Sequence, residues 1–187
     1  MTKPICTVIV GLPAMGKSTR VATLATMNPD VFVYSTDSYI DQQAQAFGKT
    51  YNEVFKDYIG KATTRMNALL DIAINGKADI IWDQTNLGID KRRKIISRMK
   101  QAGYQVCCEC IVPPESDYDG SKEDWAQRLA NRPGKTIPDN ILYSMMDSFV
   151  MPSVEEGFEQ IIFFNMYGAL IAIDYGEEKW PYYNTFI

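Results

Sequence analysis

The stretch of sequence that decides the fold is Gly11-Leu12-Pro13-Ala14-Met15-Gly16-Lys17-Ser18, followed by Thr19. It fits the Walker A pattern, G-x-x-x-x-G-K-[ST], in full. The glycines let the backbone wrap tightly enough for successive N–H groups to face a phosphate. A helix beginning at the end of this loop would add its positive N-terminal end to the same anion site. The stretch therefore predicts a site for the phosphates of a nucleotide.

Two side chains of this loop carry the expected chemistry. Lys17 would place a positive charge on the β- and γ-phosphates of ATP, and the Ser18 hydroxyl would ligate Mg²⁺. The residues expected to bind the nucleotide are Gly11, Ala14, Met15, Gly16, Lys17, Ser18 and Thr19. A glycine-rich turn with an incidental lysine is the alternative, but this pattern arises by chance in such a chain on the order of once in a few hundred.

Apolar runs too short for helices alternate along the chain with stretches of helical composition. Strands are predicted at residues 5–10, 31–34, 79–82, 104–112, 159–165 and 170–173, and helices at 17–27, 51–75, 90–102, 125–131 and 139–149. This alternation predicts an α/β fold with a central, mainly parallel sheet flanked by helices. With the Walker A loop, it indicates a P-loop NTPase of the small-kinase type. The length and the lack of repeats or linkers favour one domain, residues 1–187.

Composition restricts the possible functions. The chain of 187 residues has a formal net charge of −4 and contains no histidine. The negative charge argues against general coating of nucleic acid, although a local site for a nucleic-acid end stays open. Without imidazole, a general base must be a carboxylate or a less usual group.

The same composition bears on compartment and metal binding. No apolar run approaches the ~18 residues of a membrane-spanning helix, and the N-terminus leads straight into a strand rather than a signal peptide. With only four cysteines, we expect a cytoplasmic protein without a disulfide framework and without a membrane partner. Cys107, Cys108 and Cys110 lie on a predicted strand and are interpreted as strand residues rather than metal ligands. The sequence does not indicate an oligomeric state.

Two aspartates directly follow predicted strands, where the ligand crevice of a parallel sheet lies. Asp37 follows the second strand and could orient an attacking hydroxyl and take its proton. The alternative is that Asp37 only caps the next helix. Asp83 follows the third strand, in the position of a Walker B carboxylate, and could bind Mg²⁺ through a water.

An arginine-bearing lid is predicted around residues 128–135. Arg128 and Arg132 are four residues apart and would share one helix face near its C-terminal end. The Pro133-Gly134 pair then forces a loop that ends at Lys135. Two guanidinium groups over the triphosphate would neutralise charge that develops during phosphoryl transfer. Surface arginines favoured by a helix C-terminus are the alternative.

Together these motifs resemble the polynucleotide 5′-kinase family, over about residues 3–150. The matching residues, in order, are Gly11 to Thr19, Asp37, Asp83-Gln84-Thr85-Asn86-Leu87, Lys91-Arg92-Arg93, and Arg128, Arg132 and Lys135 before Ile137-Pro138. The resemblance implies that Asp37 is the general base, and that Arg128 and Arg132 contact the donor phosphates. It also implies that Asp83 and Asn86 shape the site between donor and acceptor.

The chain departs from that family in two places. Kinases of nucleic-acid ends typically carry an arginine three residues after the base, where it grips the acceptor phosphate, but here the residue is Ile40. The partner phosphatase domain is absent, and Asp117-Tyr118-Asp119-Gly120, which has some likeness to its motif, is interpreted as a loop. Residues 151–187 would complete the fold or form an interface.

The function predicted is Mg²⁺-dependent transfer of the γ-phosphate of ATP to a hydroxyl, with the 5′-hydroxyl end of DNA or RNA as the leading acceptor. A hydroxymethylated base in DNA, or a nucleoside or other small molecule, is the first alternative. A nucleotide-binding switch without transfer activity is the second.

The basic segment 91–100 could guide a polyanion or be a solvated helix face. The aromatic segment 180–186 could pack on the domain, mediate a dimer or stack a base.

Overall fold

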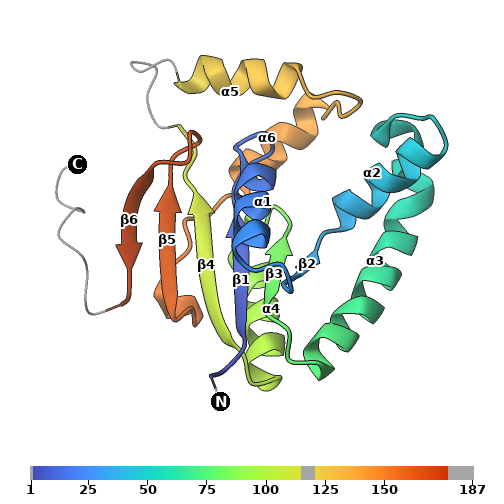
Figure 1. The fold of residues 1–187 in the computed structure, drawn as a ribbon. Helices are drawn as coiled ribbons and strands as arrows, with labels where there is room; N and C mark the ends of the chain where they lie inside the picture. The colour runs from blue at the N-terminus through green and yellow to red at the C-terminus, as the bar shows by residue number, and fades with distance from the viewer. Residues whose placement is uncertain (1, 115–120, 177–187) are drawn as a thin grey trace.

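A computed structural model describes residues 2–114 and 121–176 of the chain. Six strands form one sheet in the order β2-β3-β1-β4-β5-β6, as Figure 1 shows. Their bounds are Ile5–Val10 (β1), Phe32–Tyr34 (β2), Ile80–Asp83 (β3), Gln105–Ile111 (β4), Gln160–Phe164 (β5) and Leu170–Asp174 (β6). The first five strands pair in parallel, and only β6 runs antiparallel, beside β5. The predicted α/β fold with a mainly parallel sheet is confirmed.

The helices agree with the predicted ones except near α2 and α5. They are α1 (Lys17–Met27), α2 (Thr36–Ala46), α3 (Tyr51–Asn75), α4 (Ile89–Gln101), α5 (Ser121–Ala130) and α6 (Asp139–Asp147), with a short 3₁₀ turn, η1, at Val154–Glu156. The sequence did not predict α2. The helix predicted at 125–131 runs from Ser121 to Ala130, so Arg132 lies in the loop after it, and the helix face that Arg132 was expected to share with Arg128 is wrong.

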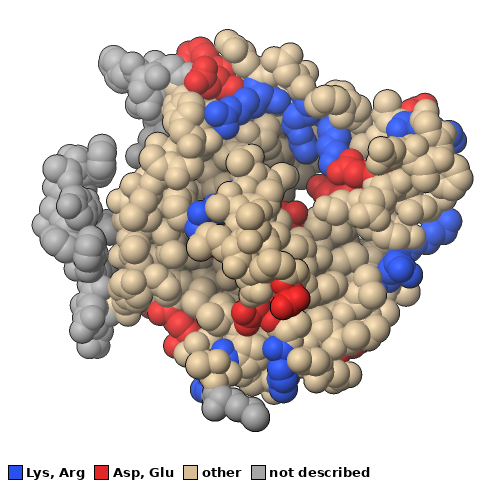
Figure 2. Space-filling view, viewed as in Figure 1, with Lys and Arg blue, Asp and Glu red and all other residues tan. Residues whose placement is uncertain are grey.

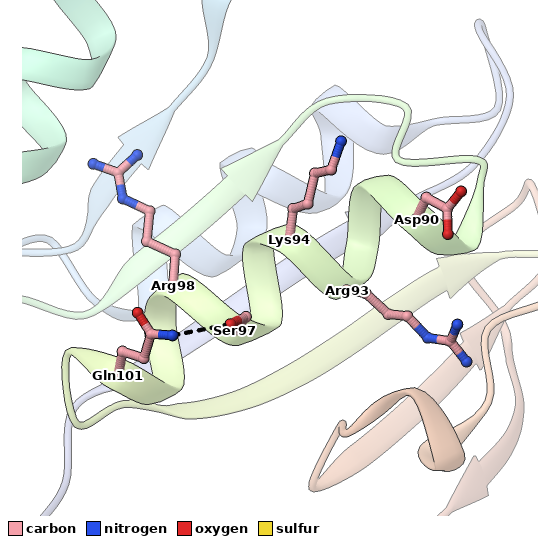
Figure 3. Close-up of a pocket in the computed structure, with 6 residues that line it drawn as sticks. All are labelled: Asp90, Arg93, Lys94, Ser97, Arg98 and Gln101. Atoms are coloured by element: carbon pink, nitrogen blue, oxygen red, sulfur yellow. Dashed lines mark hydrogen bonds between the residues drawn. The ribbon is translucent and has the colours of Figure 1, made fainter.

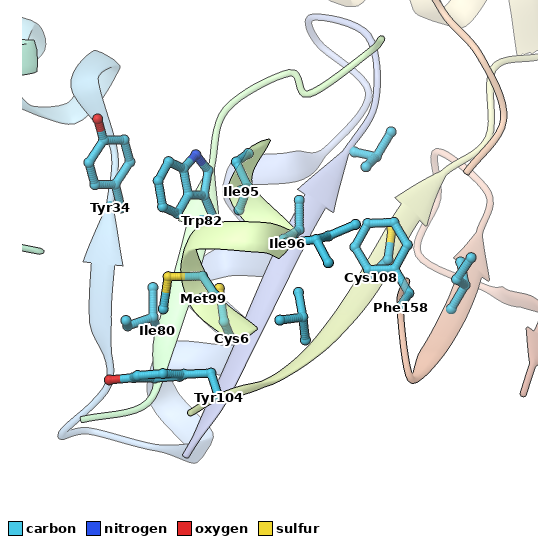
Figure 4. Packing of buried hydrophobic residues seen from close by; sticks show 14 of the residues in the cluster. Cys6, Tyr34, Ile80, Trp82, Ile95, Ile96, Met99, Tyr104, Cys108 and Phe158 are labelled. Atoms are coloured by element: carbon cyan, nitrogen blue, oxygen red, sulfur yellow. The ribbon is translucent and has the colours of Figure 1, made fainter. Parts of the chain in front are cut away.

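Apolar side chains on both faces of the sheet make the core. On one face, Ile95, Ile96 and Met99 of α4 lie against Cys6 of β1 and Cys108 of β4, as Figure 4 shows. On the other face, α1 packs through a separate cluster with β1 and β3. Because strand side chains alternate between faces, Cys108 and Cys110 are buried together, whereas Cys107 opposes them and is half-buried. This agrees with their interpretation as strand residues.

The α2–α3 hairpin has its own small core, beside the edge of the sheet (Figure 1). Ile40 and Ala44 of α2 pack with Val54 and Ala62 of α3, and Ile40 is fully buried. A capping box between Thr50 and Glu53 begins α3. Position 40 therefore faces the hairpin core, and its side chain does not reach the ligand edge of the sheet.

A fourth apolar cluster covers the carboxyl edge of the parallel strands. It joins the nucleotide loop to α5, to the loop after β3 and to the turn between β5 and β6, through Leu12, Met15, Leu87, Ile111, Trp125 and Met166. The side chain of Met15 is fully buried in this cluster. Only the backbone of Met15 is therefore available to a nucleotide.

A buried ion pair supports the start of α4. Arg92 is fully buried, and its guanidinium donates to both carboxylate oxygens of Glu156 at 2.7 and 2.8 Å. The same guanidinium donates to the carbonyl oxygens of Asn86 and Leu87 at 3.1 and 2.6 Å. Arg92 is thus a structural residue, and it does not belong to the exposed basic face that the sequence suggested for segment 91–100.

No helix in the described ranges is both long enough and apolar enough to cross a membrane. The segments 117–120 and 180–186, which carried predictions, lie outside the residues that the structure describes.

Replacing Arg92 with Met should lower the free energy of unfolding by about 3–5 kcal/mol, because it leaves a buried carboxylate and two carbonyl oxygens without their partner. Lys100→Met is the matched control, since its ammonium pairs with Glu159 at 3.2 Å on the surface, where such a pair contributes less than about 1 kcal/mol. Urea denaturation measures both. Equal losses in the two variants would contradict a structural role for Arg92.

Candidate active site

The nucleotide loop has the backbone shape that a phosphate cradle needs. Gly16 has φ +95° and Ala14 has φ +62°, so the chain turns sharply before α1. A Cβ at Gly11 would lie 3.2 Å from the Ile111 carbonyl oxygen, so a larger residue would force β4 away. The N-terminus of α1 has no side-chain cap and no acidic residue in its first turn. Its N–H groups and dipole are therefore well placed for an anionic ligand.

Lys17 folds back onto this loop. Its Nζ donates to the Leu12 carbonyl oxygen at 2.8 Å. Burial lowers the pKa of Lys17 to about 8; the charge of Asp83 opposes this, the charge of Arg132 adds to it, and the charge of Asp37 opposes it. Three side chains predicted from distant segments thus act electrostatically on the one ammonium group, so the structure brings them together.

Asp83 and the helix that carries Asp37 are linked by one hydroxyl. The Ser35 hydroxyl lowers the pKa of the Asp83 carboxyl, and the Ser35 oxygen accepts the backbone N–H of Ser38 at 3.3 Å as the N-cap of α2. Burial raises the pKa of Asp83, while the Ser35 hydrogen bond and the Lys17 charge oppose the rise. Since Ser35 is the cap, the alternative that Asp37 serves as N-cap is wrong.

Asp37 lies in the first turn of α2, where its side chain is exposed, and it accepts a hydrogen bond. The Tyr51 hydroxyl, at the start of α3, donates to its Oδ1 at 2.8 Å. Burial, together with the charge and the hydrogen bond of Asp37, raises the pKa of Tyr51, so this hydroxyl stays a donor. One carboxylate oxygen is thereby held, while Oδ2 makes no hydrogen bond or ion pair within residues 2–114 and 121–176 and can face an acceptor hydroxyl.

The loop after α5 closes against the α2–α3 hairpin, and we call residues 132–136 the strap. Lys135 pairs with Asp41 at 2.6 Å, and its Nζ lies 4.3 Å from the centre of the Tyr51 ring. The Asn52 side chain donates to the Thr136 carbonyl oxygen at 2.8 Å. Arg132 acts electrostatically on both Lys17 and Tyr51, so the strap brings its charge near the nucleotide loop and near the start of α3.

The helix α5 is anchored to the nucleotide loop. Trp125 Nε1 donates to the Pro13 carbonyl oxygen at 2.8 Å. The Arg128 guanidinium donates to the Met166 carbonyl oxygen at 2.9 Å, and that oxygen lies 3.4 Å from the place of a Cβ on Gly16. Arg128 is therefore fixed beside the last glycine of the nucleotide loop.

Figure 2 shows the resulting charge pattern: basic side chains gather beneath α5 and the strap, and acidic side chains face them from the start of the α2–α3 hairpin. The hollow between these two groups is the space that donor and acceptor would share. The basic wall could bind phosphate, and the acidic wall could accept a proton from a hydroxyl placed between them.

Asn86 contributes to the site by shaping it. Its side chain is fully buried, and Nδ2 donates to the carbonyl oxygens of Ile9, Gln84 and Trp82 at 2.8, 3.2 and 3.4 Å. Its backbone has φ +48°. The Asn86 side chain is thus turned toward the strand ends, and its role in shaping the site between donor and acceptor stays a prediction.

Several residues of the site were not found from the sequence. Tyr51 and Trp125 reach the site through the hairpin and through α5, and neither belongs to a motif. Lys91, at the start of α4, lies within the field of Asp37, because burial lowers the pKa of Lys91 and the Asp37 charge opposes that shift. Sequence spacing placed Lys91 in a basic segment without connecting it to Asp37.

The arrangement fits ATP and Mg²⁺. Ser18 is exposed at the mouth of the cradle, and Asp83 carries the nearby carboxylate expected to act through a water. In the described ranges, no group of three or more Cys, Asp or Glu side chains gathers as a metal site of its own. Ser18, Asp83 and the nucleotide phosphates would together supply the oxygen ligands that Mg²⁺ prefers.

This fold and site define a P-loop nucleotide-binding domain. The chain belongs to the AAA domain family, whose model matches residues 7–152. Similar solved structures include a chain of the PezAT chromosomal toxin–antitoxin system of Streptococcus pneumoniae, with 19% identity over 91% of this chain and 72% of that chain, and a TM-score of 0.57.

Two further similar structures are described as kinases. A protein of Chloroflexus aurantiacus assigned as a kinase has a TM-score of 0.62 and 16% identity, over 88% of this chain and 86% of that chain. A fungal RNA kinase has a TM-score of 0.55 and 12% identity, over 88% of this chain and 75% of that chain. At these identities the likeness is one of fold alone.

The lowered pKa of Lys17 predicts that ATP affinity depends on pH. A bound phosphate would raise this pKa again, so binding at pH above about 8 must take up a proton, and the affinity should fall toward tenfold per pH unit. Isothermal titration calorimetry between pH 7 and 9.5 measures this fall. Lys17→Arg is the control, because a guanidinium does not titrate there; an equal fall in that variant would contradict the assignment to Lys17.

Replacing Tyr51 with Phe should lower kcat for any hydroxyl acceptor by about tenfold, because Asp37 loses the hydrogen bond that orients it. The affinity for ATP should stay within about twofold, since Tyr51 lies on the acceptor side. Steady-state kinetics and a nucleotide-binding titration separate the two. Tyr58→Phe, on the same helix away from Asp37, serves as control, and a similar loss in both variants would show a general effect on α3.

Proposed function

We propose that this protein is an ATP-dependent kinase that transfers the γ-phosphoryl group to a hydroxyl, with the 5′-hydroxyl end of a nucleic acid as the acceptor. The observation that carries the proposal is the placement of Asp37. Its carboxylate is oriented by Tyr51 at 2.8 Å, and its charge reaches Lys17 in the nucleotide loop. A base held by a hydrogen bond and facing the donor site has the geometry that phosphoryl transfer to an alcohol requires.

In the reaction proposed, Asp37 takes the proton of the acceptor hydroxyl while its oxygen attacks the γ-phosphorus. The bond from that phosphorus to the bridging oxygen breaks, and ADP leaves. Lys17 and Arg132 would stabilise the negative charge on the transferring group, and Arg128 would hold the donor from the Gly16 side. Mg²⁺, when bound, would neutralise charge on the β- and γ-phosphates.

Cations around Asp37 favour an acceptor that itself carries phosphate. Position 40, where the resembling kinases have an arginine, is buried in the hairpin core. Two lysines from other elements bring positive charge to Asp37 instead. Lys91 of α4 is acted on by the charge of Asp37, and Lys135 of the strap lies over the ring of Tyr51. They could hold the acceptor phosphate in place of the missing arginine. The fungal RNA kinase that shares this fold supports the same substrate class.

A small-molecule hydroxyl is the second candidate, and the strap favours it. The Lys135–Asp41 ion pair and the hydrogen bond between Asn52 and Thr136 bridge α5 and the hairpin. This bridge narrows the approach to Asp37, so a compact acceptor would enter without breaking it. A hydroxymethylated base in DNA would need the bridge to open.

The proposal is tested by incubating the protein with γ-labelled ATP, Mg²⁺ and a panel of acceptors: 5′-hydroxyl DNA and RNA oligonucleotides, nucleosides and hydroxymethylated DNA. Label on an oligonucleotide 5′ end is the expected result. Label only on a nucleoside or base would reassign the acceptor and keep the mechanism. ATP binding without label on any acceptor would favour the switch over the kinase.

Replacing Asp37 with Asn should lower kcat by roughly 10²–10⁴-fold, while the Kd for ATP changes by less than about threefold. The amide keeps the size of the side chain and can accept from Tyr51, but it cannot take a proton at neutral pH. Asp57→Asn, at an exposed position of α3, is the control and should leave kcat near that of the parent. Parallel loss of transfer and ATP binding in Asp37→Asn would sink the assignment of Asp37 as base.

A further inference from the structure

We infer that one flank of α4 is a track for the phosphates of a single-stranded acceptor beyond its 5′ end. The α4 track is defined here as Lys91, Lys94 and Arg98. The inference rests on the proposed function, because it describes how the same site would hold a nucleic-acid strand. The acceptor would then be an oligonucleotide of several residues rather than a nucleoside.

The helix geometry aligns the three side chains. Residues at i, i+3 and i+7 share one face of an α-helix, and Figure 3 shows Lys94 and Arg98 on the same side of α4. The Arg98 guanidinium contacts Asp71 at 2.7 Å and Asn67 at 3.5 Å, so this flank faces α3. Lys100 lies on the opposite flank, where it contacts Glu159.

The track begins at the active site. The helix α4 starts at Ile89, directly after the loop that follows β3 at the carboxyl edge of the sheet. Lys91, in its first turn, lies in the field of Asp37. From Lys91 to Arg98 the helix rises about 10 Å, which corresponds to about three nucleotides at the ~3.4 Å rise of a stacked strand. A strand with its 5′-hydroxyl at Asp37 would therefore run along this flank.

The charge on α4 is available for a ligand. The helix holds six of the 19 Lys and Arg residues of a chain whose net charge is −4. Arg92 and Lys100 are paired with glutamates, but no ion pair among the described residues involves Lys91, Arg93 or Lys94. Figure 3 shows the shallow groove on this surface, which is lined by Asp90, Arg93, Lys94, Ser97, Arg98 and Gln101.

A polyanion fits this surface better than a peptide or a lipid headgroup. The cations follow one another along a line at the spacing of a helix, without the apolar side chains that a membrane or partner helix would need on the same flank. Among the described residues, the ion pair that engages the track joins Arg98 to Asp71, which is exposed on α3; Asp90 also lines the groove beside Lys94. A phosphate at Arg98 would replace this weak surface pair.

The experiment measures kcat/KM for 5′-hydroxyl oligonucleotides of two, three, five and ten residues. The parent protein should prefer the longer acceptors, with a plateau near five residues. In Lys94→Gln/Arg98→Gln, the ratio of kcat/KM between the decamer and the dimer should fall roughly tenfold. The salt dependence of the decamer KM should also weaken by about 1.4 in log–log slope, for two lost phosphate contacts.

Two variants make the test specific. Asp71→Asn removes the competing carboxylate and should lower the decamer KM, the opposite direction from the double variant. Lys100→Gln carries the same loss of charge on the other flank and should keep the parent length dependence. An equal effect of Lys100→Gln, or acceptors of all lengths used equally well by the parent, overturns the track and leaves the proposed function standing.

A binding measurement tests the α4 track separately from the kinase activity. Fluorescence anisotropy with a 3′-labelled, 5′-hydroxyl decamer requires no transfer. If no oligonucleotide is phosphorylated, the proposed function fails, and the track is then judged on binding alone. Weaker binding in the double variant than in Lys100→Gln supports it, and no binding, or equal binding in the two, overturns it.

Discussion

The buried amide of Asn86 joins the ends of two neighbouring strands, and the candidate active site is built on that junction. Its Nδ2 donates to the Ile9 carbonyl oxygen near the end of β1 and to the carbonyl oxygens of Trp82 in β3 and Gln84 just after it, while the Gly11 N–H donates to the Thr85 carbonyl oxygen at 3.1 Å. The guanidinium of Arg92, on α4, donates to the Asn86 carbonyl oxygen in the same loop. Since the cradle follows β1 and Asp83 ends β3, this junction sets the distance between the phosphates and the carboxylate.

The acceptor side depends on weaker and more exposed contacts than the donor side. The cradle and α5 share a buried cluster and a hydrogen bond from a buried indole. The strap, by contrast, is held to the hairpin by Lys135–Asp41 and by exposed backbone and side-chain hydrogen bonds, which contribute little each. Under the proposed function, a firmly packed donor site beside a lightly held acceptor side would allow acceptors to enter and leave while the nucleotide stays aligned.

The sequence was sufficient for the sheet and for the shape of the nucleotide loop, because these depend on local pattern, such as a strand that ends in a glycine loop. It also placed Asp37 past a strand end, and the role of Asp37 as base stays a prediction. The sequence was insufficient where long-range packing decides. Asn86 was expected near the substrate, but an asparagine at a strand end can equally turn inward and satisfy carbonyl oxygens. The partnership of Tyr51 with Asp37 requires the α2–α3 hairpin to fold back, and the place of Arg132 depends on α5 ending at Ala130. No spacing rule contains that information.

The buried state of Ile40 changes how the missing arginine should be understood. Because that position points into the hairpin core, an arginine there would require a different packing of α2 on α3, and its absence here is a consequence of this core rather than a vacancy at the site. Positive charge instead reaches Asp37 from α4 and from the strap. These two sources approach from different elements, so a strand could be held by α4 while the strap closes over its terminal residue. An acceptor phosphate between Lys91 and Lys135 would pair with both ammonium groups. The hydroxyl next to that phosphate would then lie at Asp37, which the Tyr51 hydroxyl orients.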